Sequence, residues 1–120
     1  MMHEYSVVAS LMELCEEHAR AHGAVSVQKV VVSIGERAGM DRSLFESAFE
    51  AFKLESEVCK ESALEIVLEG VELSCRACGH HFSPQGMAYG ECEQCQSSDL
   101  EMTKGKEMYL MSLELCGEGA

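Results

Sequence analysis

The stretch CRACGHHFSPQGMAYGECEQC, residues 75–95, decides the fold because it holds two Cys-x-x-Cys pairs. Cys75 pairs with Cys78 and Cys92 with Cys95, and thirteen residues separate the two pairs. Two residues between cysteines let both thiolates meet one ion at tetrahedral angles, and this spacing is typical of a zinc ribbon. We therefore predict a structural zinc site with four thiolate ligands and no open position for a substrate.

Two disulfides are the alternative interpretation of these cysteines. Disulfides require an oxidising compartment, and the first ten residues, MMHEYSVVAS, have no basic segment ahead of an apolar run. The chain also lacks an apolar stretch long enough to cross a membrane. The chain has three further cysteines, Cys15, Cys59 and Cys116. The total is therefore odd, which fits reduced thiols better than a set of cysteines paired in disulfides. We expect a cytoplasmic protein in which zinc holds the four thiolates.

Composition and charge limit the core and the kinds of partner. The 120 residues are 47% hydrophobic, which suits one modest core domain with a small metal-stapled lobe. With 21 acidic and 9 basic residues, the formal net charge is −12. We expect no nucleic-acid partner, because phosphate binding needs clustered Lys and Arg. An acidic surface favours cations or basic protein patches instead.

The apolar periodicity predicts two helices. The first covers residues 4–20, and Gly23 stops it from continuing. Its apolar stripe consists of Tyr5, Val8, Met12, Cys15 and Ala19. Asp41 is a candidate N-cap for the second helix, which ends before Cys59. Its apolar stripe consists of Leu44, Phe45, Ala48, Phe49 and Phe52.

Alternating apolar residues predict strands over residues 25–34 and 64–69 and, near the C-terminus, over 107–115. The last strand carries Tyr109, Met111, Leu113 and Leu115 on one face, too large a face for a small ribbon to cover. We therefore expect this strand to return to the first domain. The predicted fold is α+β, with two helices packed on a small mixed β-sheet and an inserted zinc-ribbon lobe. The core domain would comprise residues 1–72 and 106–120, and the ribbon residues 73–105.

The start of the chain has the chemistry of a nickel site. An α-amino nitrogen, ionised backbone amides and the imidazole of His3 can form fused chelate rings in one plane, a geometry that Ni²⁺ and Cu²⁺ favour. If Met1 is retained, these groups fill four positions. If Met2 comes first, the amide of Glu4 or a water must supply the fourth ligand. A solvated terminal histidine is the alternative from the residues alone.

Taken together, these features resemble the HypA/HybF family. The resemblance is carried by Met2-His3-Glu4 running into Tyr5-Ser6, a strand ending Ile34-Gly35-Glu36, the helix core from Leu44 to Phe49, and the two late Cys-x-x-Cys pairs. Members of this family are nickel metallochaperones for [NiFe]-hydrogenase maturation. The family motif places its histidine second, whereas Met1 makes it third here.

The resemblance implies Ni²⁺ as transient cargo at Met1, Met2, His3 and Glu4, beside a structural Zn²⁺ at the four cysteines. It also implies three partners: a nickel-handling GTPase of the hydrogenase maturation pathway, the hydrogenase large subunit and, where members serve urease, a urease nickel chaperone. We predict that the protein is not an enzyme. The sequence leaves open the client enzyme and whether the protein is a monomer or a homodimer.

Four other histidines are further candidate ligands. His18 and His22 are spaced i, i+4 and could hold a metal on one helix face, although histidines near a helix C-terminus more often only interact with its dipole. His80 and His81 follow the first cysteine pair and are alternative zinc ligands.

Two other functions fit the cysteine pairs. One is a zinc-ribbon adaptor that binds a protein partner without carrying nickel, and the other is a thiol oxidoreductase that uses one Cys-x-x-Cys pair. The sequence shows neither a Gly-rich phosphate loop nor a serine nucleophile elbow, so catalysis has little support.

Overall fold

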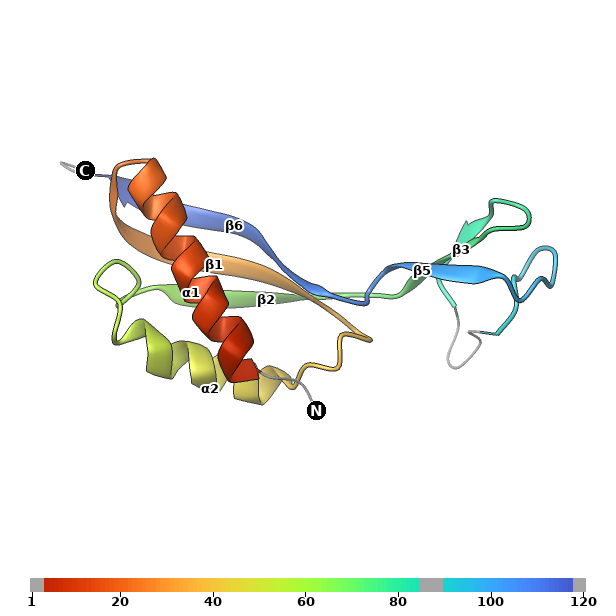
Figure 1. Cartoon of the computed structure of the whole chain (residues 1–120), viewed down its shortest axis with the longest axis horizontal. Helices are drawn as coiled ribbons and strands as arrows, with labels where there is room; N and C mark the ends of the chain where they lie inside the picture. The colour runs from red at the N-terminus through yellow and green to blue at the C-terminus, as the bar shows by residue number, and fades with distance from the viewer. Residues whose placement is uncertain (1–3, 85–89, 118–120) are drawn as a thin grey trace. The chain divides into compact units, whose positions relative to one another are not determined.

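The computed structural model describes residues 4–84 and 90–117, and these residues fold into two compact units (Figure 1). Unit 1 takes in the chain up to residue 33, residues 39–67 and the chain from residue 109. Unit 2 takes in Ile34–Ala38 and Leu68–Met108. The predicted α+β class is confirmed. None of the described helices is long and apolar enough to span a membrane.

The two helices of unit 1 are α1 (Glu4–Ala21) and α2 (Arg42–Lys53), and they pack against each other. Gly23 follows α1 with φ +66°, a left-handed conformation that glycine adopts without steric cost. Asp41 is the N-cap of α2, as predicted, because its Oδ1 accepts a hydrogen bond from the Leu44 N–H at 3.0 Å. The buried residues of the helices are Val8, Leu11, Met12, Cys15, Ala19, Phe45, Ala48 and Phe49, together with Glu4.

Two residues that the sequence placed on the apolar stripes are exposed. Tyr5 is 56% exposed, and its ring meets Phe52 edge-on with centroids 6.1 Å apart. Leu11 occupies the core instead, because it continues the i, i+3, i+4 set of α1 toward Cys15. Leu44 is 41% exposed, whereas the next residue, Phe45, is fully buried, so the buried face of α2 consists of Phe45, Ala48 and Phe49.

The sheet of unit 1 contains β1 (Ala24–Gly35), β2 (Ala63–Glu69) and β6 (Met108–Gly117) in the order β2-β1-β6. Figure 1 shows β1 and β2 running in the same direction and β6 running back, so the sheet is mixed. The predicted return of the last strand is therefore confirmed. Tyr109 and Met111 are 46% and 49% exposed, whereas Leu113 and Leu115 on the same face are half-buried, so only the second half of the apolar face contributes to the core.

Unit 2 is built on a second, antiparallel sheet of β3 (Glu72–Cys75), β4 (His81–Phe82) and β5 (Leu100–Lys104), in the order β4-β3-β5. Leu73 pairs with Phe82 on one side and with Met102 on the other. The small core consists of Val71, Leu73, Cys75, Phe82 and Cys92, with Leu100 and Met102 packed against it. The sequence did not predict β4, because two residues carry no alternation.

The end of β1 and the three residues after it, Ile34–Ala38, belong to unit 2 and are held there by backbone hydrogen bonds. The N–H groups of Gly35, Glu36 and Arg37 donate to the carbonyls of Glu107, Glu69 and Gly105 at 3.0, 2.9 and 2.7 Å. A Cβ on Gly35 would overlap the backbone of Gly105, so this approach requires glycine. These units are defined by packing, and the predicted bounds of separate domains, 1–72 with 106–120 and 73–105, stay a prediction.

Candidate metal centre

The Sγ atoms of Cys75, Cys78, Cys92 and Cys95 gather in unit 2, all within 4.8 Å of one another. Cys75 and Cys95 lie 3.6 Å apart, and Cys78 and Cys92 3.7 Å apart. Ligands at about 2.3 Å from a tetrahedral Zn²⁺ would lie roughly 3.8 Å from one another. None of the seven cysteines, all of them among the described residues, forms a disulfide. The spacing of the four sulfurs thus fits a tetrahedral ion.

The first pair is held by a tight turn that follows β3. The N–H of Gly79 donates to the Cys75 carbonyl at 2.8 Å, and the Cys75 N–H donates to the His80 carbonyl at 2.9 Å. The N–H of Cys78 points at the Cys75 sulfur, 3.4 Å away. Gly79 has φ +81°, which explains the glycine directly after the second cysteine.

The second pair repeats the same backbone turn. The N–H of Gln96 donates to the Cys92 carbonyl at 2.9 Å, and the Cys92 N–H donates to the Ser97 carbonyl at 2.8 Å. The N–H of Cys95 points at the Cys92 sulfur, 3.4 Å away. Gln96 takes the place of Gly79 with φ 63°, a conformation that costs a residue with a side chain roughly 1–2 kcal/mol. Two equivalent turns therefore present the four thiols to a common centre.

The four thiols cannot all ionise next to one another without a cation. The N–H of Cys78 lowers the pKa of Cys75 to about 7. The backbone at His80 acts to lower the pKa of Cys78, but burial and the neighbouring thiols outweigh it and raise that pKa to about 12. A divalent ion supplies the missing positive charge, because it holds coordinating thiols in the deprotonated form. The donor set therefore suits Zn²⁺ in chemistry as well as in geometry.

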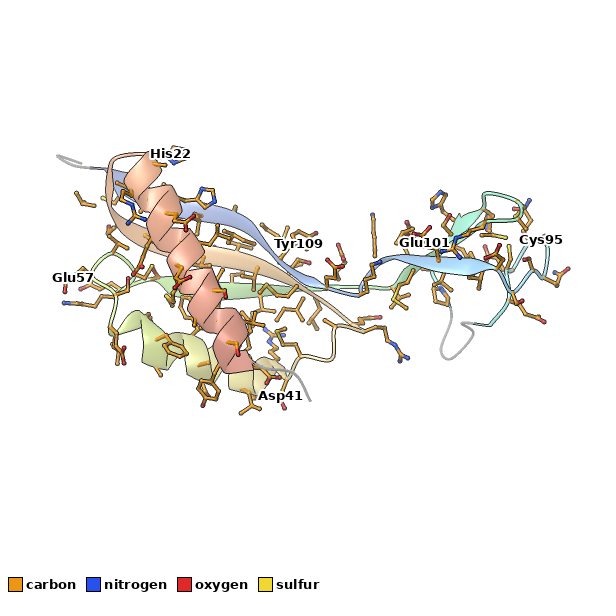
Figure 2. All side chains as sticks on the ribbon, in the orientation of Figure 1. His22, Asp41, Glu57, Cys95, Glu101 and Tyr109 are labelled. Carbon is orange, nitrogen blue, oxygen red and sulfur yellow. The ribbon has the colours of Figure 1, made fainter. Side chains whose placement is uncertain are left out.

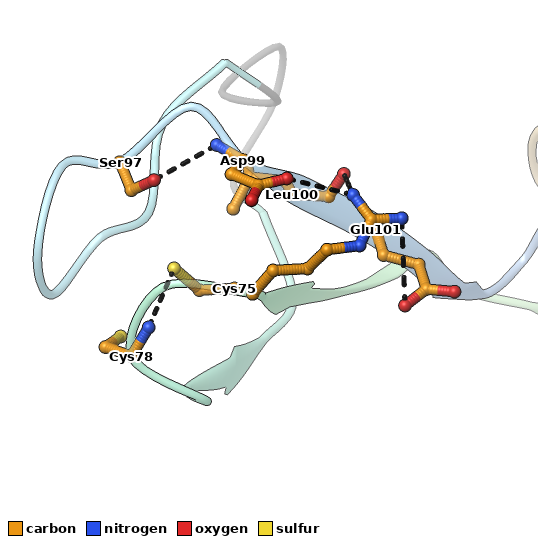
Figure 3. A network of polar contacts seen from close by, with 7 residues as sticks. Cys75, Cys78, Ser97, Asp99, Leu100 and Glu101 are labelled. Atoms are coloured by element: carbon orange, nitrogen blue, oxygen red, sulfur yellow. Dashed lines mark hydrogen bonds and ion pairs between the residues drawn. The ribbon is translucent and has the colours of Figure 1, made fainter.

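A polar network connects the first cysteine turn to the start of β5 (Figure 3). Arg76 forms ion pairs with Asp99 at 3.0 Å and with Glu101 at 3.9 Å, and it donates to the Leu100 carbonyl at 3.4 Å. The Ser97 hydroxyl accepts the Asp99 N–H at 3.1 Å. Because these side chains are about half exposed, each ion pair contributes little stability alone. Together they fix the orientation of Arg76 beside Cys75.

The two histidines after the first cysteine pair contact carboxylates. His80 Nε2 lies 2.6 Å from Glu93 Oε2, and its ring stacks on Phe82 at 5.6 Å. His81 Nδ1 lies 3.6 Å from Glu72 Oε1. Neither histidine belongs to the described group of ligand atoms around the four sulfurs, so their role as alternative zinc ligands stays a prediction. No sequence pattern indicates that Glu72 and Glu93 are their partners.

Of the predicted nickel ligands, Met1, Met2 and His3 lie outside the described residues. Glu4 is described and is only 4% exposed. Its Oε2 accepts the backbone N–H of Asp41 at 2.8 Å, and Asp41 in turn caps α2. Sequence reasoning treated Glu4 as a ligand and Asp41 as a cap, and it did not connect them.

Comparison with known proteins agrees with this arrangement. Residues 2–115 match the family model described as HypA, hydrogenase/urease nickel incorporation, metallochaperone. The hydrogenase/urease maturation factor HypA of Helicobacter pylori is 56% identical over 98% of this chain and 100% of its own length. The hydrogenase maturation factor HypA of Helicobacter hepaticus is 53% identical over 95% of this chain and 97% of its own.

The fold of this chain also matches solved structures of similar proteins. The solution structure of the Ni metallochaperone HypA from Helicobacter pylori has a TM-score of 0.79 at 56% identity, covering 98% of this chain and 100% of that one. A second solution structure of a HypA protein has a TM-score of 0.82 at 55% identity, covering 98% and 99%. The resemblance seen in the sequence is confirmed, and the chain belongs to the HypA family of hydrogenase/urease nickel-incorporation metallochaperones.

Proposed function

We propose that this protein binds Ni²⁺ at its N-terminus and delivers it during maturation of [NiFe]-hydrogenase, while a structural Zn²⁺ occupies the four-cysteine site. Membership of a nickel-incorporation family is the observation that carries the proposal. The partners would be the nickel-handling GTPase and the hydrogenase large subunit, met in the cytoplasm. Urease is a further client to test, because a relative 56% identical is named a hydrogenase/urease maturation factor.

The cysteine site suits a resident ion and not a cargo. Four thiolates fill all positions of a tetrahedral ion, and a bound Zn²⁺ would offset half of their negative charge and hold the two turns together. Cys75 and Cys92 are 1% exposed, so half of the ligand set is shielded from an incoming acceptor. An ion that must be handed on needs a more open site.

The terminal segment offers such a site. An amine, backbone amides and the imidazole of His3 suit a planar Ni²⁺, whereas Zn²⁺ has no such preference. Glu4 supports this proposal by its position, because its carboxylate fixes the first turn of α1 to the N-cap of α2. Its Oε2 already accepts a hydrogen bond, so the role we assign to Glu4 is to hold the segment and to offer its amide or free carboxylate oxygen.

The test is a nickel titration of zinc-loaded protein, with the absorption of planar, low-spin Ni²⁺ as the signal. The His3→Ala variant should lose this signal and fail to mature the client, while zinc content and melting temperature stay the same. The matched control His81→Ala removes an exposed imidazole far along the chain and should keep the signal. A His3→Ala protein with the planar spectrum of the wild type would refute the terminal site.

The alternative function is a zinc-ribbon adaptor that binds a partner without nickel. Zinc-loaded wild-type protein that takes up no nickel, but still binds the GTPase, would favour the adaptor. One equivalent of zinc that resists mild reductant would exclude a thiol oxidoreductase.

A further inference from the structure

Away from the cysteine cluster, two imidazoles lie next to each other at the C-terminal end of α1. His18 and His22 are one helical turn apart, with ring centroids 6.4 Å apart and ring planes inclined by 34°. Figure 2 shows His22 at the end of α1, with Asp41 near the opposite end of the same helix. Histidines at i, i+4 project from one helix face, the spacing with which a helix chelates a metal ion.

A backbone contact determines which nitrogen of His22 is available. Nδ1 of His22 lies 2.9 Å from the carbonyl oxygen of His18. A carbonyl oxygen only accepts, so Nδ1 carries the proton, and Nε2 of the neutral ring keeps its lone pair. A hydrogen bond of this kind orients a metal-binding imidazole and raises its basicity. His22 is therefore already held in the tautomer that a ligand needs.

The two rings line a cleft of about 380 Å³ whose other wall is β6. Leu110, Met111, Leu113 and Leu115 supply the apolar part of that wall, and Ser112 supplies a hydroxyl. The apolar wall shields one side of the imidazole pair from water, while the open side leaves room for water ligands.

The electrostatic setting favours a cation. The C-terminus of a helix carries a partial negative charge on its last carbonyls, and the whole chain has a formal net charge of −12. Arg20 is the competing cation of the last turn, but it lines a different cleft with Glu16 and Glu57. The cleft beside His18 and His22 contains no lysine or arginine among its described lining residues.

We propose that His18 and His22 form a second, bidentate site for a late first-row divalent cation such as Ni²⁺ or Cu²⁺, with water completing the coordination. Imidazole nitrogen suits these ions, and affinity follows the order in which Cu²⁺ exceeds Ni²⁺. The site does not depend on the terminal one, because His18 lies fourteen positions after Glu4 along α1, a rise of roughly 21 Å. Both rings are exposed, so solvent and a metal ion can reach them.

The experiment uses full-length, zinc-loaded His3→Ala protein, so that the terminal site is absent. Ni²⁺ is titrated while amide and imidazole NMR signals are recorded, because octahedral Ni²⁺ is paramagnetic and broadens the signals around it. Broadening should begin at residues 18–22 and 110–113. Replacing either histidine by alanine should weaken binding by about tenfold or more, at least as much as loss of an orienting partner costs a metal site.

A matched control separates chelation from simple imidazole binding. The double variant His18→Ala with Ala21→His keeps two imidazoles at the same end of α1 but places them side by side in sequence, where they cannot share an ion. It should bind as weakly as His18→Ala alone. Unchanged Ni²⁺ affinity in His18→Ala, or control binding equal to that of the His3→Ala parent, would overturn the proposal. Helix content and zinc stoichiometry verify that each variant is folded.

Discussion

The carboxylate of Glu4 accepts a hydrogen bond from the backbone N–H of Asp41 across 2.8 Å, and it thereby connects the first turn of α1 with the N-cap of α2. Asp41 uses its own carboxylate to accept the Leu44 N–H. The two residues therefore fix the starts of both helices at one point, directly after the proposed nickel ligand His3.

Removing the Glu4 acceptor should destabilise unit 1. We expect Glu4→Ala to lower the free energy of unfolding by about 1–3 kcal/mol, because the Asp41 N–H is left without a partner. Glu4→Gln keeps an acceptor oxygen at the same place and should lose clearly less. Urea denaturation measures both, and equal losses for the two variants would show that the hydrogen bond is not the stabilising feature.

Loss of one cysteine ligand should remove zinc and loosen unit 2 alone. We expect Cys92→Ala to abolish stoichiometric zinc and to increase hydrogen exchange from about residue 75 to 100, because metal-binding free energy is folding free energy in such lobes. Cys116→Ala, a change outside the cluster, should retain zinc. An equal collapse of exchange protection in α1 would contradict the division into a core domain and a ribbon domain.

Glycine should be required at position 105. Gly105 has φ +88°, and a Cβ there would lie 2.8 Å from the Cα of Val71. Gly105→Ala should cost at least about 1–2 kcal/mol from backbone conformation alone. Gly70→Ala is the control, since a Cβ at Gly70 has nothing within 4 Å. Thermal unfolding of zinc-loaded protein compares them, and similar melting temperatures would show that the turn can relax.

The buried thiols of Cys15 and Cys59 should make stability depend on pH. A hydrogen bond with Cys15 lowers the pKa of Cys59 from 9.0 to about 7, and the same contact raises the pKa of Cys15. Between pH 7 and 9 the unfolded chain holds the Cys59 proton that the folded protein has released, so stability should rise by about 1–3 kcal/mol. Above pH 9 the retained proton on Cys15 should reverse the trend.

The Cys59→Ser variant isolates this effect, because a hydroxyl does not titrate in that range. Its unfolding free energy, measured by urea denaturation at constant zinc, should lose the rise between pH 7 and 9. Cys116→Ser should retain the rise. A wild-type protein without the rise would mean that burial, which opposes ionisation, outweighs the hydrogen bond.

The register of the terminal nickel site should depend on Met1. Deleting Met1 removes one amide from the chelate rings, so we expect a changed nickel spectrum. Adding residues before Met1 should weaken binding, because a peptide-bonded nitrogen is no longer a free amine. Visible absorption and calorimetric titration report both changes, and identical nickel spectra for all three termini would argue against coordination by the amine.

Much of the fold was predictable because the spacing of apolar residues indicates which segments form helices and strands. The valines of β1, the phenylalanines of α2 and the apolar face of β6 each marked an element, and the size of the β6 face predicted its return to the first sheet. The attachment of Ile34–Ala38 to unit 2 was not predictable, because backbone N–H groups make those bonds and side chains leave no pattern for them. Tyr5 was predicted on the buried stripe of α1 but is exposed. Helical spacing does not distinguish a buried aromatic ring from one that packs on the surface, as Tyr5 does against Phe52.

The cysteine site was predictable from spacing alone, since two short turns suffice to build it. The equivalence of Gly79 and Gln96 was not, because glycine signals a left-handed residue and glutamine does not. The contact between Glu4 and Asp41 joins residues 37 positions apart, and no local pattern records it.

Because β6 follows the four cysteines in the sequence, their order sets an order of events during synthesis. All four cysteines leave the ribosome before Met108–Gly117, the strand that pairs with β1. The metal lobe can therefore close while one edge of β1 is still unpaired. An unpaired edge invites pairing between nascent chains, and the strong negative charge of this protein opposes that by mutual repulsion.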